Sequence, residues 1–218
     1  MRTIANCVES LLHTQPFLEE ALSRGIINYS ALAEELKNPI ELQLKKSIKT
    51  GAIVMALRRY SPPKDALLHQ RLKSVLQNLG DITVRSNLID FTVKNSPTLI
   101  EKHVRVLNSV TENPSVFYTF TRGIHESSII ISESEQQKLQ LHFKNETIIE
   151  VKKQLSGISV SLPTVNTKVT GLYYQIFKQL AWEGIAIYEV ISTTNEFTIL
   201  VEDPIVDQAF SVIKRLGN

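Results

Sequence analysis

The stretch "GLYYQIFKQLAWEGIAIYEVISTTNEFTILVED", residues 171–203, decides how the C-terminal part of this 218-residue chain folds. Its first half repeats apolar residues at helical spacing, with Leu172, Ile176 and Leu180 on one face. Gly184 lets the chain leave that helix in a left-handed turn. Two apolar strands follow, separated by the polar turn "TTNE". The pattern predicts a helix and a β-hairpin that pack against each other.

The same order of elements occurs twice in the chain. The first copy has the strand "LIDFTV", the helix "SPTLIEKHVRVLNSVTEN", two strands around Gly123, the short helix "SEQQKLQLHF" and the strand "ETIIEVKKQL". In the second copy, which begins at Gly157, "ISVSLP" precedes the helix and hairpin above, and "PIVDQAFSVIKRL" forms a last helix. This copy has no fourth strand after its last helix. We expect residues 82–86, "ITVRS", to fill that place, so that the two copies interleave.

The second copy resembles an ACT domain of the aspartokinase type. The matching features are Gly171 at a helix start, the turn "LAWEGI", the strand "EVIST" and the strand "EFTILVED". The paired copies resemble the regulatory tail of aspartokinases, and the whole chain resembles a family of stand-alone predicted regulators of amino-acid metabolism. The resemblance implies an α+β fold, with a helical N-terminal domain followed by two ferredoxin-like (βαββαβ) ACT domains. It also implies small-molecule sensing.

The resemblance further implies where a ligand binds. In the ACT family an amino acid commonly lies between two domains, held by the loop before the first helix and by the strand after it. Free N–H groups at a helix start favour a carboxylate, and strand carbonyls or Glu189 can receive an ammonium group. The expected ligand-binding residues are Asn166, Thr170, Gly171, Leu172, Ile185, Ala186, Ile187, Glu189, Ser192 and Thr193.

A purely structural role for the same polar residues is the alternative. In that interpretation Glu189 faces solvent, Ser192 and Thr193 only shape a turn, and Gly171 serves backbone geometry. The aromatic pair that follows Gly171 either lines the pocket or packs in the core. The sequence leaves both interpretations open.

The N-terminal segment predicts short helices with explicit ends. Thr14 is the expected N-cap of the first helix, ahead of Pro16, and Gly25 is its expected end. "INYSALAEELK" predicts a second helix, and Asn38 followed by Pro39 restarts the chain as a third. "TGAIVMALRRY" predicts a fourth, with its arginines at the negative end of the helix dipole. This order resembles a helix-turn-helix DNA-binding module.

The basic residues of the chain are concentrated in its N-terminal part. Residues 1–80 hold 11 Lys and Arg against 7 Asp and Glu, whereas residues 81–218 hold 13 against 15. Such a patch attracts phosphates, although a solvated helix surface is the simpler explanation. If nucleic acid binds, the expected contacts are Lys45, Lys46, Lys49, Arg58 and Arg59.

Other functional classes find little support in the sequence. Apolar runs fall far short of the roughly 20 residues of a membrane span, so no membrane partner is expected. A lone Cys7 and the lack of a secretion signal suit the cytoplasm. The eight glycines form no phosphate cradle, and no pair of histidines has metal-ligand spacing. We therefore expect neither enzymatic activity nor a cofactor or metal.

These observations give an expected domain organisation. A helical, helix-turn-helix-like domain spans 1–62, a connector helix 63–80, a first ACT-like domain 81–156 and a second ACT domain 157–218. The chain is expected to be a homodimeric, ligand-sensing regulator of amino-acid metabolism that binds an amino acid and also binds DNA. The alternative is an allosteric partner of a biosynthetic enzyme that does not bind DNA.

Overall fold

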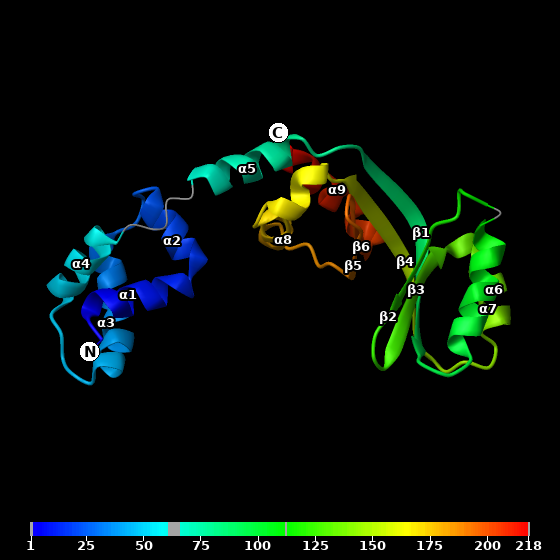
Figure 1. Cartoon of the computed structure of the whole chain (residues 1–218), viewed down its shortest axis with the longest axis horizontal. Coiled ribbons are helices and arrows are strands. Elements are labelled where there is room, and N and C mark those ends of the chain that lie inside the picture. The colour runs from blue at the N-terminus through cyan, green and yellow to red at the C-terminus, as the bar shows by residue number, and fades with distance from the viewer. Residues whose placement is uncertain (1, 61–65, 112, 218) are drawn as a thin grey trace. The chain divides into compact units, whose positions relative to one another are not determined.

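The structure is a computed structural model that describes residues 2–60, 66–111 and 113–217 (Figure 1). It divides into two compact units, Met1–Ala66 and Leu67–Asn218. We call them the N-terminal unit and the sheet unit and describe each by itself. The expected break "SPPKD" at 61–65 lies outside the described residues.

Four helices make up the described part of the N-terminal unit: α1 (Ile4–His13), α2 (Pro16–Ser23), α3 (Tyr29–Leu44) and α4 (Thr50–Arg59). They share one apolar core, which includes the fully buried Leu12, Ile40 and Ile53. The turn between α3 and α4 is held by Glu41, whose Oε1 accepts hydrogen bonds from the Ile48 N–H (2.9 Å) and the Ser47 hydroxyl (3.2 Å).

Two predictions for these helices are wrong. Thr14 does not begin a helix but ends α1, because its hydroxyl donates to the Leu11 carbonyl (2.8 Å) and Gln15, whose backbone is not helical, precedes Pro16. Pro39 does not start a new helix but lies inside α3. The buried face of α3 continues on both sides of it, and that packing offsets the one backbone hydrogen bond that proline removes.

The described part of the sheet unit contains six strands and five α-helices. The strands are β1 (Ile82–Lys94), β2 (Tyr118–Arg122), β3 (Glu126–Ser132), β4 (Ile148–Ser161), β5 (Glu189–Ser192) and β6 (Glu196–Glu202). The α-helices are α5 (Ala66–Gln77), α6 (Leu99–Thr111), α7 (Gln136–His142), α8 (Leu172–Trp182) and, at the C-terminus, α9 (Val206–Leu216), of which α5 precedes the first strand. Short 3₁₀ turns lie at Glu133–Glu135, Thr164–Lys168 and Asp203–Ile205.

The six strands form one antiparallel sheet in the order β2-β3-β1-β4-β6-β5. The C-terminal part of β1 and the N-terminal part of β4 complete a first four-stranded half with β2 and β3. The C-terminal part of β4 and the N-terminal part of β1 complete a second half with β5 and β6. Each half therefore has the ferredoxin-like strand order, and the expected fold class is confirmed.

Residues 82–85 pair with the second half, as expected from its missing strand. Ile82 is opposite Val160, and Arg85 is opposite Gly157. The same strand then continues without a break into the first half. The domain boundary expected at Gly157 lies inside β4. The two halves share the long strands β1 and β4, so the limits of the two domains stay a prediction.

A pair of fully buried leucines marks the place where the long strands pass from one half to the other. Leu88 of β1 is opposite Leu155 of β4, and both are 0% exposed. The residue before each leucine has a positive φ, 58° at Asn87 and 57° at Gln154. The two long strands thus bend at equivalent points, and the two halves are related by an approximate two-fold axis between the leucines.

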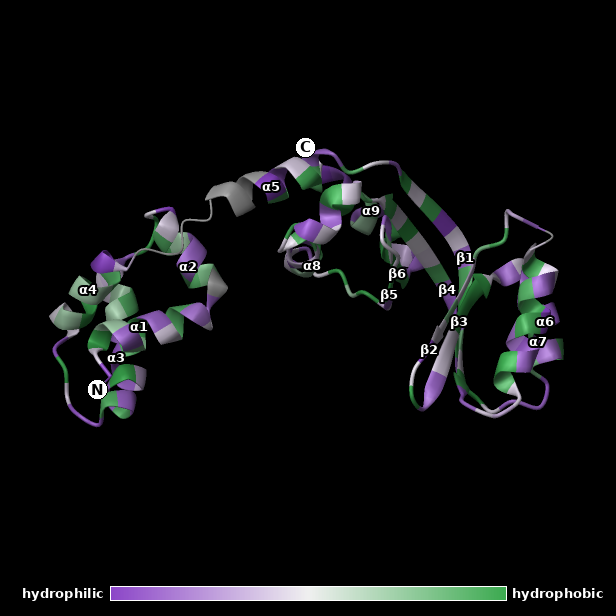
Figure 2. Cartoon of the chain, in the orientation of Figure 1, coloured by the Kyte–Doolittle hydropathy of each residue, from purple (hydrophilic) through white to green (hydrophobic). Residues whose placement is uncertain are grey.

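Each half buries its own helices against the sheet. Ile89, Phe91 and Val93 of β1 pack with α6 and α7 in the first half. In the second half α8 and α9 cover β4 and β6, and Val75 of the connector helix α5 joins that core. Figure 2 shows hydrophobic residues recurring along these helices and strands. The first of the two strands expected after Gly184, residues 185–192, is shorter than expected, because β5 begins at Glu189.

Candidate functional site

A groove of about 470 Å³ lies in the second half, between the loop that precedes α8 and the turn that joins β5 to β6. It combines the open end of a helix with aromatic, hydroxyl and small apolar side chains. The lining residues are Asn166, Thr167, Val169, Gly171, Leu172, Tyr173, Tyr174, Thr193 and Thr194.

Asn166 fixes the two walls of this groove relative to each other. Its side chain is buried, and its Nδ2 donates to the carbonyls of Pro163 (2.9 Å) and Thr194 (2.8 Å). The first bond closes the loop on itself, and the second ties the loop to the β5–β6 turn. An amide that satisfies two carbonyls in this way makes the groove a preformed feature of the fold.

The N-terminus of α8 opens into the groove. Gly171 precedes the helix with φ 86°, a left-handed conformation that favours glycine, and no side chain caps the helix. The first N–H groups of α8 therefore carry the positive end of the helix dipole without a side-chain acceptor. Beside them the Tyr173 hydroxyl lies 2.7 Å from the Ser192 Oγ. The arrangement suits a small anion such as a carboxylate.

The structure brings together only part of the expected ligand-binding set. Asn166, Gly171, Leu172 and Thr193 line the groove, and Ser192 reaches it through Tyr173. The others do not line it: Thr170 is exposed in the same loop, Ile185, Ala186 and Ile187 follow α8 at its far end, and Glu189 lies at the opposite end of β5.

Several lining residues were not in the expected set. Thr167 belongs to a 3₁₀ turn and Val169 and Thr194 to irregular backbone, whose course no periodicity predicts. Tyr173 and Tyr174 are 39% and 41% exposed, so they do line the groove. Their position next to the helix-opening glycine was the available signal.

The corresponding loop of the first half is closed by a carboxylate of the chain itself. Glu146, with a side chain 2% exposed, accepts hydrogen bonds from the hydroxyls of Ser96 and Thr98, both 2.6 Å, and lies 2.7 Å from the Lys102 Nζ. Burial alone would raise the pKa of Glu146, but the bonds from Lys102, Ser96 and Thr98 outweigh it and hold the pKa below 4.5.

Gly80 occupies the place of Glu146 in the second half. The backbone bond from Lys94 N to Thr147 O (2.9 Å) has its counterpart in the bond from Ser161 N to Asp81 O (3.0 Å). The two accepting residues, Thr147 and Asp81, are therefore equivalent. The residue before them is Glu146 in the first half and Gly80 in the second. A Cβ at Gly80 would lie 2.8 Å from the Ser161 Cβ, so the second half has no room for such a side chain. Its loop before α8 lacks this internal carboxylate.

Comparison with known proteins identifies the fold. No family model matches the sequence, and no curated protein matches it. Among solved structures, the aspartate kinase of Clostridium acetobutylicum is 18% identical with a TM-score of 0.53, over 64% of this chain and 35% of the kinase. The regulatory subunit of Thermus thermophilus aspartate kinase is 8% identical with a TM-score of 0.51, over 63% of this chain and 97% of the subunit.

The sheet unit has the fold of a pair of ACT domains. We call its first half ACT1 and its second half ACT2. The resemblance seen in the sequence is confirmed at the level of the fold. The chain spans only about a third of the length of the Clostridium kinase.

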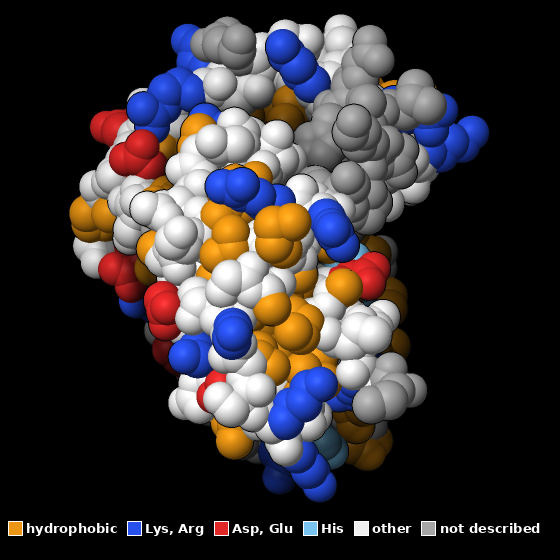
Figure 3. Space-filling view, turned by 90° about the vertical axis from the view of Figure 1, so that its left-hand side faces the viewer, with side chains coloured by type: hydrophobic (Ala, Val, Ile, Leu, Met, Phe, Trp, Pro, Cys, Tyr) orange, Lys and Arg blue, Asp and Glu red, His pale blue; other side chains and the backbone are white. Residues whose placement is uncertain are grey.

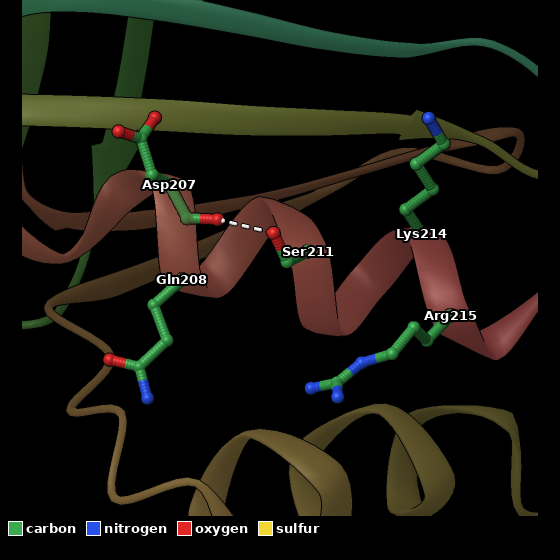
Figure 4. A pocket seen from close by; sticks show the side chains of 5 residues that line it. All are labelled: Asp207, Gln208, Ser211, Lys214 and Arg215. Carbon is green, nitrogen blue, oxygen red and sulfur yellow. Dashed lines mark hydrogen bonds between the residues drawn. The ribbon is translucent and has the colours of Figure 1, made fainter.

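A second groove, of about 530 Å³, runs along α9 in ACT2 (Figure 4). Gln208 and Arg215 point toward α8, whereas Asp207 and Lys214 point toward the other side of the helix. Arg215 already pairs with Glu183 at 2.9 Å. This surface is the exposed face of one helix and its arginine is neutralised, so the groove at Gly171 is the better candidate despite its smaller volume.

The five basic residues expected at a nucleic-acid surface are all exposed. Lys45, Lys46 and Lys49 lie in the turn between α3 and α4, and Arg58 and Arg59 end α4. Among the described residues none of the five forms an ion pair. Figure 3, which looks onto the N-terminal unit, shows Lys and Arg side chains around a band of apolar ones.

In the part of the chain that the structure describes, no group of three or more His, Cys, Asp and Glu side chains is placed to hold a metal ion. No helix there is long and apolar enough to cross a membrane.

Replacing Glu146 tests its role in ACT1. The pKa of Glu146 is lower in the folded protein than in the unfolded chain. The stability that its carboxylate contributes is therefore fully present above pH 4.5 and is lost as the pH falls through the pKa of the folded state. Glu146→Gln should therefore lower the free energy of unfolding by about 2 kcal/mol at pH 7 and by less at pH 3. Chemical denaturation at both pH values measures this.

The matched control is Glu101→Gln, which removes an exposed ion pair with Arg105 on the same helix as Lys102. It should change stability by less than about 0.5 kcal/mol at either pH. Equal effects of the two substitutions at pH 7 would show that Glu146 has no special role.

Proposed function

We propose that this protein is a ligand-sensing regulator of amino-acid metabolism and that its effector, an amino acid, binds in the ACT2 groove. The observation that carries the proposal is the uncapped N-terminus of α8 at a groove of small-molecule size. The fold shared with a kinase regulatory subunit supports a regulatory and non-enzymatic role.

The groove offers a partner for each part of an amino acid. The carboxylate would accept hydrogen bonds from the first N–H groups of α8. The ammonium group would meet hydroxyl and carbonyl oxygens of Thr193 and Thr194, because Glu189 does not line the groove. The side chain of the effector would lie against Val169 and the two tyrosines. In ACT1 the loop is already closed by Glu146, so we assign sensing to ACT2.

A thermal scan against the twenty amino acids tests this site. An effector at about 100 times its Kd adds about 2.7 kcal/mol of stability. Gly171→Ala should abolish most of that gain, because a methyl group and a strained φ would alter the helix start that receives the carboxylate.

Gly184→Ala is the matched control for Gly171→Ala. Gly184 also has a positive φ, 68°, and nothing lies within 4 Å of a Cβ there, but it does not line the groove. Both variants should lose about 1–2 kcal/mol of intrinsic stability, and only Gly171→Ala should lose the response to effector. An unchanged response in Gly171→Ala would remove this groove from consideration.

We further propose that the N-terminal unit binds nucleic acid and that the effector modulates this binding. Two helices joined by the turn Lys45–Lys49 fit a helix-turn-helix, and the left-handed Lys45 (φ 52°) makes that turn short. Five exposed cations at the two ends of α4 would contact phosphates. Arg58 and Arg59 lie at the C-terminal end of α4, and this position favours contacts to the phosphate backbone of DNA over contacts to its bases.

Salt dependence distinguishes phosphate contacts from other modes of binding. The double variant Arg58→Ala/Arg59→Ala should weaken binding to all DNA sequences alike and reduce the log–log salt slope by about 2. The control Arg2→Ala/Arg24→Ala removes the same charge elsewhere in the unit and should leave the slope nearly unchanged. If the parent protein binds no genomic fragment at low salt, with or without amino acids, the chain is better explained as the allosteric partner of a biosynthetic enzyme.

The proposed regulator is a homodimer that pairs through α6. This helix exposes Ile100, Val104 and Leu107 on one face, at 40%, 48% and 42%. A second copy packed antiparallel would bring Glu101 of each helix near Arg105 of the other, so the face is complementary to itself in charge as well as apolar.

Light scattering at micromolar concentration should give twice the mass of the chain. Val104→Lys should yield a folded monomer, because the charge would be buried at the centre of the interface. Ile124→Lys, at a hairpin turn where Ile124 is 88% exposed, is the control and should remain dimeric. A monomeric parent protein would contradict the proposal.

A further inference from the structure

The connector helix α5 packs against ACT2 through one apolar stripe. The stripe consists of Leu72, Val75, Leu76 and Leu79, which recur at helical spacing and all belong to the core of ACT2. Val75 is 3% exposed, whereas the residues that separate the members of the stripe are exposed. Because one side of α5 is buried in this way, the helix is a part of ACT2 rather than a free linker.

Close backbone contacts hold the C-terminal part of α5 to ACT2. The Gly80 N–H donates to the carbonyl of Ser161, the last residue of β4 (2.8 Å). A Cβ at Gly217, which follows α9, would lie 3.3 Å from the Leu76 carbonyl oxygen, so the end of α9 touches the backbone of α5. This part of the helix has little room to move without disturbing the core of ACT2.

The N-terminal part of the stripe reaches the start of α8. A Cβ at Gly171 would lie 3.5 Å from the Leu72 Cδ2, so a methyl group of Leu72 lies against the turn that opens the helix. Leu72 does not line the groove, and a molecule in the groove would not touch it. Gly171 therefore borders both the groove and α5.

ACT1 holds the equivalent residue by a different contact. Thr98 directly precedes α6, as Gly171 directly precedes α8. The Thr98 hydroxyl donates to the Glu146 carboxylate (2.6 Å). In ACT2 the place of Glu146 is taken by Gly80, where the chain passes from α5 to β1. The segment that supplies a carboxylate to the helix start in ACT1 thus brings an apolar helix to it in ACT2.

We propose that Leu72 positions the start of α8 and that α5 carries the occupancy of the ACT2 groove toward the N-terminal unit. In the chain, α5 is the first element of the sheet unit after the N-terminal unit. An effector carboxylate on the first N–H groups of α8 holds the Gly171 turn, and this turn in turn holds Leu72. Such coupling acts in both directions, so a displaced α5 weakens effector binding. The route rests on the proposed effector site, whereas the positioning role of Leu72 does not.

Amide hydrogen exchange of the full chain without ligand tests the positioning role. The reporter is the Gln175 N–H, which donates to the Gly171 carbonyl (3.0 Å), and the reference is the Glu183 N–H at the other end of α8, which donates to Gln179 (3.2 Å). Leu72→Ala should raise the ratio of reporter to reference exchange rates about tenfold, because the helix start opens locally. Leu72→Met restores the apolar volume and should restore the parent ratio.

Leu76→Ala is the matched control. Leu76 belongs to the same stripe and the same core, but it lies next to Gly217 rather than Gly171. This variant should keep the parent ratio even where it lowers the stability of the whole unit. The positioning role is refuted if Leu72→Ala leaves the ratio unchanged, or if Leu76→Ala raises it as much.

An amino acid that stabilises the parent protein in the thermal scan tests the route. At about 100 times its Kd it should slow exchange in residues 71–77 by up to about 100-fold, because an opening that disturbs the helix start competes with binding. In Leu72→Ala this slowing should be lost, while the slowing at Gln175 persists. Leu76→Ala should keep both effects. Equal slowing of residues 71–77 in the parent and in Leu72→Ala would refute the route.

The two experiments separate a failure of the route from a failure of the effector site. If no amino acid stabilises the parent, the effector site and the route fail together, and the exchange ratio without ligand still decides the role of Leu72. If an amino acid binds but exchange in residues 71–77 does not change, the effector site stands and the route is refuted.

Discussion

The antiparallel pairing of β1 with β4 is the interaction on which the rest of the sheet unit depends. Each of these long strands supplies the first strand of one ACT domain and the last strand of the other. Leu88 and Leu155, both fully buried, meet where the strands change domain. Neither domain can complete its sheet without the other, so the two form one cooperative structure rather than two modules on a linker.

The approximate two-fold symmetry makes the differences between the domains informative. An asparagine ties the loop before the helix to the hairpin turn in both: Asn95 donates to the Gly123 carbonyl (2.9 Å), and Asn166 to the Thr194 carbonyl. The loops differ at Glu146 and Gly80, which give ACT1 an internal carboxylate and ACT2 none. One scaffold thus holds a closed loop and an open one, and the open loop is where we propose that the effector binds.

The edge strand β5 has contacts of two kinds. Its last residue, Ser192, contacts Tyr173 at the groove, and Tyr188, the residue before its first, donates a hydrogen bond to Asp90 of ACT1. An edge strand has only one hydrogen-bonded neighbour, here β6, so it moves more easily than a central strand. The hydrogen bond from Tyr188 to the buried Asp90 restrains its start.

The sequence by itself determined the order of elements and the interleaving. The spacing of Leu172, Ile176 and Leu180 fixed one face of α8, and the absence of a last strand in the second copy pointed to residues 82–86. These features are local, because periodicity and turn residues act within a few positions of the chain.

The tertiary structure decided the features that depend on distant neighbours. Helix α1 was missed, although Thr3 and Asn6 form a capping box at its start, and Pro39 stays within α3 because the buried face of that helix continues past it. Glu189 was placed with the ligand by its position in the chain, but it lies at the end of β5 away from the groove. Side-chain partners across a sheet are set by strand register and packing, which no short stretch of sequence encodes.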